Sequence, residues 1–109
     1  MNTFKIKTEK IDEEEAYLSV TDADGENPVV KIVSPSSGPV CVVTAQLHRG
    51  EVLPDGILAA RSDPETTEVT ETLEKLGLLE RIDAVLSHGP TVFPLFRLNR
   101  DLALSYCGS

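Results

Sequence analysis

Two cysteines and two histidines are the side chains in this sequence best suited to act as nucleophiles, bases or soft metal ligands: Cys41, Cys107, His48 and His88. A cysteine nucleophile needs a base within hydrogen-bond reach, and no two of these residues are close in sequence. Zinc needs three or four ligands, so a zinc site would require all four to converge from distant segments. Cys41 lies in an apolar run, where burial would raise the pKa of its thiol and make it unreactive. We expect two reduced thiols, although the sequence leaves open whether they pair.

Three further patterns fail as chemical sites. The run Asp22–Gly25 resembles the start of an EF-hand calcium loop, but that loop needs Gly at position six and Glu at position twelve. Those positions hold Asn27 and Val33, so a hairpin turn is the better interpretation. Ser36-Ser37-Gly38 lacks the Gly-x-Ser-x-Gly pattern of a nucleophilic serine, and the glycines are too scattered for a phosphate-binding loop.

We therefore predict a protein that is not an enzyme, with no catalytic residue, no cofactor and no metal. The alternative is a small hydrolase or transferase whose site assembles without a recognisable motif. A deep pocket that joins Cys41 or a histidine to carboxylates would favour that alternative.

The charge balance narrows the classes of partner. The 109-residue chain has ten Lys and Arg against eighteen Asp and Glu, a formal net charge of −8. Nucleic acids and anionic membranes attract clustered Lys and Arg, so we expect neither as a direct partner. No secretory signal and no apolar run of the roughly 20 residues that span a membrane is present, which favours the cytoplasm. The length suits a single domain, 1–109, with a tail at 99–109 that is partly packed or frayed.

The clearest helix signal covers residues 64–76. Asp63 can accept a hydrogen bond from the first turn, and Pro64 suits the first helical position; alternatively, Ser62 caps the helix. Gly77 suits the left-handed conformation that ends a helix. One apolar stripe lies along this segment: Val69, Leu73 and Leu76.

The opposite face of that helix carries four carboxylates at steps of three: Glu65, Glu68, Glu71 and Glu74. Such a row is usually the solvated side of an amphipathic helix. It is also the kind of anionic surface that docks a basic protein and speeds association by electrostatic steering. These four residues are our candidate protein-binding site. A second acidic run, Asp12–Glu15, is expected to be a solvated loop because neighbouring like charges repel.

Strands are predicted by alternating and β-branched sequences. Segments of this kind are 4–8, 16–21, 28–33 and 57–60. The second and third form a hairpin around the turn at 22–27. The continuous apolar run 40–45 predicts a strand buried on both faces, at the centre of a sheet.

The C-terminal third contains an ambiguous segment, 80–86, which suits either a helical turn or a strand. Residues 91–98 are predicted to be a strand, and Pro94 makes it an edge strand or places a bulge in it. The predicted core contains Ile6, Leu18, Val20, Val30, Ile32, Val42, Ile57, Val69, Leu73, Leu76, Phe93 and Leu95.

Several short patterns resemble those of a group of small uncharacterised bacterial proteins, including phage and plasmid proteins. The segments that carry the resemblance are Asp22–Glu26, Glu71–Glu80, Leu86–Gly89 and Pro94–Leu98. In that group a hairpin with an Asp-x-Asp-Gly-Glu-like tip precedes a strand. A helix of the pattern Leu-x-x-x-Gly-Leu/Ile-Leu/Ile-Glu follows, and the final strand ends Pro-x-x-x-Leu. The match spans about Ala16 to Leu98.

This chain lacks the aromatic residue that the group carries between the first turn and the helix, and its segment 39–47 is longer. The resemblance implies an accessory protein of a mobile element, with unknown activity, and it transfers no catalytic residues. It also implies that residues 84–98 form a hairpin and not a second helix.

Together these patterns predict an α+β domain, with a twisted antiparallel sheet of five or six strands and one main helix, about 64–76, packed on one face. We predict a non-enzymatic accessory protein that binds or inhibits a basic protein, of a nucleic-acid-handling or defence kind, through its acidic surface. The alternative is a structural or dimeric module. We expect either a monomer or a homodimer.

Overall fold

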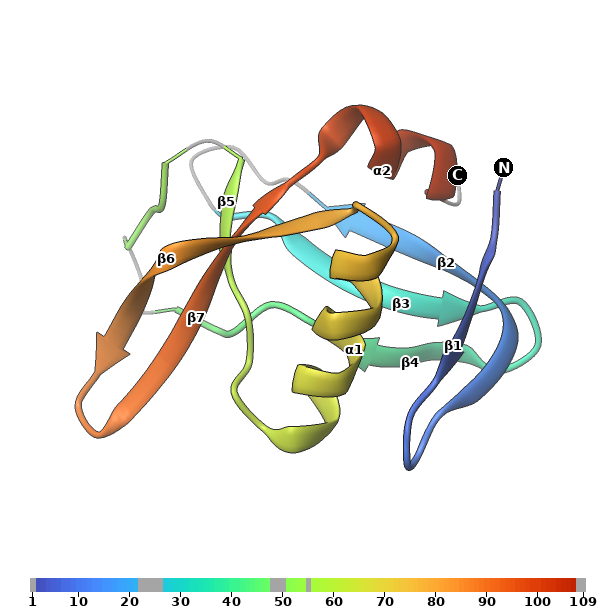
Figure 1. Ribbon diagram of the computed structural model, residues 1–109, viewed down its shortest axis with the longest axis horizontal. Coiled ribbons are helices and arrows are strands. Elements are labelled where there is room, and N and C mark those ends of the chain that lie inside the picture. Colours follow the sequence, from blue (N-terminus) through green and yellow to red (C-terminus); the bar gives the residue numbers. More distant parts are fainter. Residues whose placement is uncertain (1, 22–26, 48–50, 55, 108–109) are drawn as a thin grey trace.

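Seven strands and two helices occur in the residues that the computed structural model describes, 2–21, 27–47, 51–54 and 56–107 (Figure 1). The first antiparallel sheet has the order β1-β2-β3-β4. Its strands are β1 (Phe4–Lys7), β2 (Asp12–Thr21), β3 (Val29–Ser34) and β4 (Gly38–Val42). The second sheet has the order β5-β7-β6. Its strands are β5 (Ile57–Ala59), β6 (Leu79–His88) and β7 (Thr91–Leu98), and the helices are α1 (Pro64–Lys75) and α2 (Arg100–Tyr106).

The architecture confirms the α+β class, but the strands divide between two sheets where we predicted one. The chain that follows β4 joins the second sheet through a single bridge, between Thr44 and Ala60. The backbone N–H of Ala45 donates to the carbonyl of Ala59 at 2.8 Å. Because this pairing is so short, the twisted second sheet can turn away from the first. Alternation in the sequence marks strands without showing which distant strands pair, so it could not reveal the division.

Strands β2 and β3 form the predicted hairpin. Tyr17 lies opposite Val33, and Thr21 lies opposite Val29. The turn at 22–26 lies outside the described residues. The hairpin places Leu18 in the core, on the face that alternation predicts.

The acidic run Asp12–Glu15 is not the solvated loop that we predicted, because it forms the first part of β2 and pairs with β1. Its charges have local partners. Lys5 Nζ lies 3.3 Å from Glu14 Oε1, and the Ser34 hydroxyl donates to Glu13 Oε2 at 2.9 Å. These contacts and the backbone ladder offset the repulsion between the carboxylates.

Two strand positions also differ from our predictions. Residues 40–45 are not a central strand, since β4 ends its sheet and is only half-buried. Conversely, β7 is the middle strand of the second sheet, so an edge position for Pro94 is wrong. The pairing of β6 with β7 shifts register between Arg81 and Val85, and Val85 lies opposite Pro94. The bulge that proline predicted is therefore present, and the ambiguous segment 80–86 belongs to β6.

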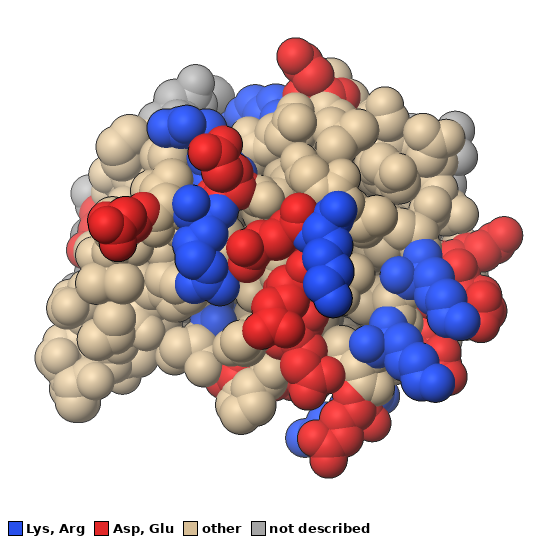
Figure 2. Space-filling view, viewed as in Figure 1, with Lys and Arg blue, Asp and Glu red and all other residues tan. Residues whose placement is uncertain are grey.

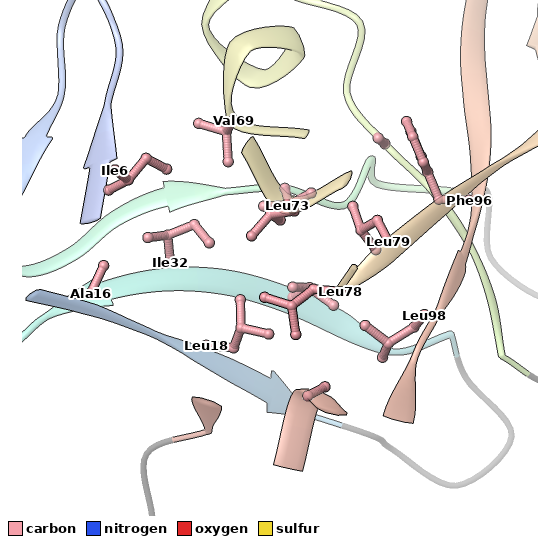
Figure 3. Close-up of a cluster of buried hydrophobic side chains, with 14 of the residues drawn as sticks. Ile6, Ala16, Leu18, Ile32, Val69, Leu73, Leu78, Leu79, Phe96 and Leu98 are labelled. Atoms are coloured by element: carbon pink, nitrogen blue, oxygen red, sulfur yellow. The ribbon is translucent and has the colours of Figure 1, made fainter. Parts of the chain in front are cut away.

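Helix α1 and both sheets share one hydrophobic core. In Figure 3, Val69 and Leu73 of α1 point into this core, towards Ile6 and Ile32 of the first sheet. The predicted core residues that are fully buried are Ile6, Leu18, Val30, Ile32, Val69 and Leu73. Val20 and Leu76 are partly buried and pack against them.

The other predicted core positions have the wrong phase. The structure leaves these predicted core residues only half-buried: Val42, Ile57, Phe93 and Leu95. The buried residues of the same segments are Val43, Leu58, Phe96 and Leu98. Leu58 lies opposite Phe96 in the ladder, so both point to the same side. An error of one residue exchanges the buried and exposed faces of a strand. Because residues 92–96 are largely apolar, their sequence does not show which face is buried.

Helix α1 begins where the sequence predicts. Asp63 is its N-cap: Oδ2 accepts a hydrogen bond from the Thr66 backbone N–H at 3.0 Å, and Pro64 occupies the first turn. The alternative cap, Ser62, is not used. The helix ends at Lys75, one residue earlier than predicted, with Gly77 just beyond it at a φ of 80°.

Removal of the Asp63 cap should lower stability. We expect Asp63→Ala to lower the free energy of unfolding by about 1 kcal/mol, because it leaves N–H groups of the first turn without a partner. Urea unfolding at neutral pH measures this. Burial opposes ionisation of Asp63, but hydrogen bonds from Thr66 and the nearby charge of Arg61 outweigh it, so the pKa of the carboxyl is lowered.

Because the pKa of Asp63 is lower in the folded state, its ionised carboxylate stabilises the fold at pH values above the ordinary pKa of 3.8. This contribution is lost as the pH falls through the folded-state pKa. Asp63→Asn keeps a capping oxygen but cannot ionise. Its stability should therefore fall less than that of the unaltered protein between pH 5 and the acid limit of about pH 2. An identical loss in both proteins would show that the cap carries no pH dependence.

Residues 100–106 form helix α2, which was not predicted from the sequence. The side chain of Asn99 accepts the backbone N–H of Leu102 at 3.1 Å. Ala103 is buried, and the Tyr106 ring meets Phe4 edge-on at 5.8 Å. The described part of the tail is therefore packed against the core. Seven residues are too few to show clear helical periodicity.

Candidate functional site

All four predicted site residues lie on α1. We call Glu65, Glu68, Glu71 and Glu74 the acidic face. Only Glu71 is exposed, and the other three are half-buried. Steps of three fall short of a 3.6-residue turn, so the row winds around the helix and its ends approach neighbouring elements.

Contacts with both sheets hold parts of the acidic face. Glu68 Oε2 accepts the backbone N–H of Glu9, in the β1–β2 turn, at 3.1 Å. Glu74 Oε1 lies 3.1 Å from Arg81 Nη2 of β6. The Arg81 guanidinium also lies over the Phe96 ring, 4.8 Å from its centre. Arg81 therefore balances the charge of Glu74, which weakens the C-terminal end of the acidic face as a docking surface.

A hollow of about 310 Å³ opens beside the first turn of α1. Its lining residues are Thr8, Glu9, Lys10, Asp63, Pro64, Glu65 and Glu68. Carboxylates outnumber the single lysine, so the hollow suits a cationic side chain better than an anion. Its volume is at the low end of the roughly 300–1,000 Å³ of ligand pockets. The sequence could not assign Glu9 to it, because Glu9 and Glu68 are 59 positions apart.

The surface view shows how charge is distributed around the helix. In Figure 2, acidic side chains form a band along α1, with Lys and Arg side chains on both sides of it. The acidic face is therefore a narrow strip with basic borders, and not one broad anionic surface. A partner that fits it needs a matching narrow row of positive charge.

Cys41 lines a second, shallow hollow, of about 260 Å³, together with Arg61, Asp63, Glu65 and Thr66. Burial raises the pKa of the Cys41 thiol, and the charges of Glu65 and Asp63 raise it further, against a hydrogen bond with Thr66 and the charge of Arg61. The thiolate is the nucleophile, and these surroundings disfavour it. Cys41 does meet carboxylates here, but they act against a catalytic thiol.

Both thiols should react slowly in the folded protein. Burial raises the pKa of Cys41 and of Cys107 above the ordinary value of 9.0, so less thiolate is present at neutral pH. We expect iodoacetamide to alkylate both more slowly than a free cysteine at pH 7, with equal rates after denaturation, as followed by mass spectrometry. Alkylation of the folded protein as fast as that of free cysteine would contradict this account.

The remaining candidates occupy different elements. Both cysteines are free, and Cys107, just after α2, forms a parallel bridge with Leu18 of β2. His88 Nε2 lies 2.6 Å from Glu51 Oε1, and the imidazole meets the Phe93 ring edge-on at 5.4 Å. This contact ties the end of β6 to segment 51–54. No local pattern predicts it, because 37 positions separate the two residues.

His48 and the acidic turn 22–26 lie outside the described residues. Within the described part of the chain, no group of three or more His, Cys, Asp or Glu is arranged to hold a metal ion. None of the helices described is long and apolar enough to cross a membrane. No family model, curated protein or solved structure matches the chain.

Proposed function

We propose that this is a non-enzymatic accessory protein that binds another, basic protein through the acidic face of α1. The observation that carries the proposal is that the acidic face continues into the hollow at the first turn, where Glu9 adds a further carboxylate beside Asp63, which is paired with Arg61 at 3.2 Å. Two segments distant in sequence thus supply one anionic strip.

The binding contribution is concentrated in the part of α1 from Glu65 to Glu71. Arg81 balances Glu74, whereas Glu65 and Glu71 make no ion pair among the described residues. We place a Lys or Arg side chain of the partner in the hollow, beside Glu65 and Glu68. A second basic side chain, one helical turn along, then meets Glu71.

The class of partner follows from the chemistry of the strip. A narrow row of carboxylates resembles in charge the phosphates that a nucleic-acid-binding protein holds. We therefore propose a nucleic-acid-handling or defence protein as the target, bound at its basic groove. The net charge of −8 disfavours direct contact with nucleic acid and with anionic membranes. We further propose an accessory role in a mobile element, as the sequence resemblance to phage and plasmid proteins implies, and a cytoplasmic location.

Capture from the native host tests the proposal. The tagged full-length protein is incubated with lysate at low salt, and bound proteins are identified by mass spectrometry. We expect a basic protein that elutes as the salt is raised and that the variant Glu68→Lys/Glu71→Lys does not retain. The variant Glu15→Lys/Asp101→Lys has the same net charge but an intact acidic face, so it should retain that protein. Equal retention by both variants would overturn the proposal.

A further inference from the structure

The four end strands of the two sheets differ in how far they are protected from pairing with another chain. Strand β1 has four residues and carries Lys5 and Lys7, and β5 has only three residues. Strand β4 has five residues and lies beside a hollow lined by Arg61, Asp63 and Glu65. Short edges and charged side chains are the usual protection of sheet edges. Strand β6 is the exception, with ten residues.

Only the first part of β6 is protected. Glu80, Arg81 and Asp83 are charged, and the register shift lies between Arg81 and Val85. The outer part, Ala84–His88, has no Asp, Glu, Lys or Arg, and neither has the facing part of β7 as far as Phe96. In the described part of the chain, β6 pairs only with β7. The edge from Ala84 to Ser87 therefore carries no charged side chain of its own, while His88 at its end is held by Glu51.

One face of this outer hairpin is apolar and exposed. Val85 lies opposite Pro94, and Ser87 lies opposite Val92, so these four side chains share a face. Val85 is 60% exposed and Val92 is 45% exposed. Figure 1 shows that this end of the hairpin extends away from α1 and α2.

We propose that this edge binds a second copy of the chain, with β6 of each molecule antiparallel about a two-fold axis. The two second sheets then form one continuous sheet, and a self-complementary contact of this kind closes on itself. The pairing places Val85 of each molecule beside β6 of the other, so that part of its exposed side chain is covered. This interface is separate from the acidic face and does not rest on the proposed function.

Charge does not oppose a second copy at β6, whereas it opposes one at β4. Two molecules of net charge −8 repel wherever their carboxylates meet. If the two-fold axis passes Val85, Asp83 lies opposite Ser87 of the second copy; if it passes Leu86, Asp83 lies opposite Gly89. Neither register places like charges opposite each other. Pairing through β4 would instead bring Asp63 and Glu65 of both copies together.

Sedimentation equilibrium of the full-length protein over a range of concentrations tests the interface. We expect the mass to rise from 11.8 kDa to twice that value. Val85→Lys places a charge on the interface and should weaken association at least about tenfold. Leu104→Lys is the control, because Leu104 lies on α2 and is even more exposed, at 74%, and it should leave association unchanged.

Hydrogen exchange locates the contact. Amides of Ala84–His88 should gain protection as the concentration rises, and those of Val40–Val42 should not. If Val85→Lys fails to fold by circular dichroism, Ser87→Lys, also exposed and on the same face, replaces it. A mass of 11.8 kDa at every concentration would overturn the proposal, and so would a dimer that neither lysine variant weakens. If the full-length protein forms the dimer but captures no basic partner from the lysate, the proposed function is wrong and the dimer interface stands.

Discussion

Leu73→Ala should lower the free energy of unfolding by about 2–5 kcal/mol. Leu73 is 1% exposed and points from α1 towards the first sheet, as Figure 3 shows. Truncation removes buried apolar surface and leaves a cavity that rigid strands on both sides cannot close. Urea denaturation followed by circular dichroism measures the change.

A matched substitution separates burial from the loss of leucine itself. Leu104→Ala removes the same atoms from a side chain that is 74% exposed, so we expect a change within about 0.5 kcal/mol. If Leu73→Ala costs less than about 1 kcal/mol, below the usual range for a buried leucine, α1 does not cover the core as described.

Charge reversal on α1 is expected to have the largest effect on binding. Glu68→Lys/Glu71→Lys should weaken the affinity for the captured basic partner at least about tenfold. Each substitution replaces an attraction by a repulsion, and the lysine introduced in place of Glu68 would occupy the hollow that receives a cation of the partner. Isothermal titration with purified partner provides the measurement.

The control keeps the net charge of that variant. Glu15→Lys/Asp101→Lys changes exposed residues on β2 and α2 and leaves all four glutamates of the acidic face in place. It should alter the affinity only slightly, because exposed charges outside the contact are screened at physiological salt. Equal weakening by both variants would mean that overall charge, and not the acidic face, governs binding.

Local signals allowed much of the fold to be predicted. Asp63, Pro64 and Gly77 mark the ends of α1 because capping and backbone conformation depend on neighbouring residues. The β2–β3 hairpin followed from alternation on both sides of a turn. By contrast, the division into two sheets depends on pairings such as Thr44 with Ala60, which no local pattern records.

The candidate site was predicted in part. Helical spacing placed the four glutamates on one helix, but it could not show that Arg81 balances Glu74 or that Glu9 joins the hollow. Both contacts come from other elements. For the acidic run Asp12–Glu15, charge alone predicted a loop. The run forms a strand because residues such as Lys5 pair with its carboxylates, and these partners cannot be identified from the run itself.

The salt dependence of the association rate shows whether the acidic face attracts the partner before contact. It is measured by stopped flow, with purified partner, for the unaltered protein and for Glu68→Lys/Glu71→Lys. If the acidic face steers the partner, the rate of the unaltered protein falls steeply as salt rises, while the variant is slow at low salt and nearly insensitive to it. A rate that does not change with salt, or the same salt dependence in both proteins, would contradict the role of the acidic face.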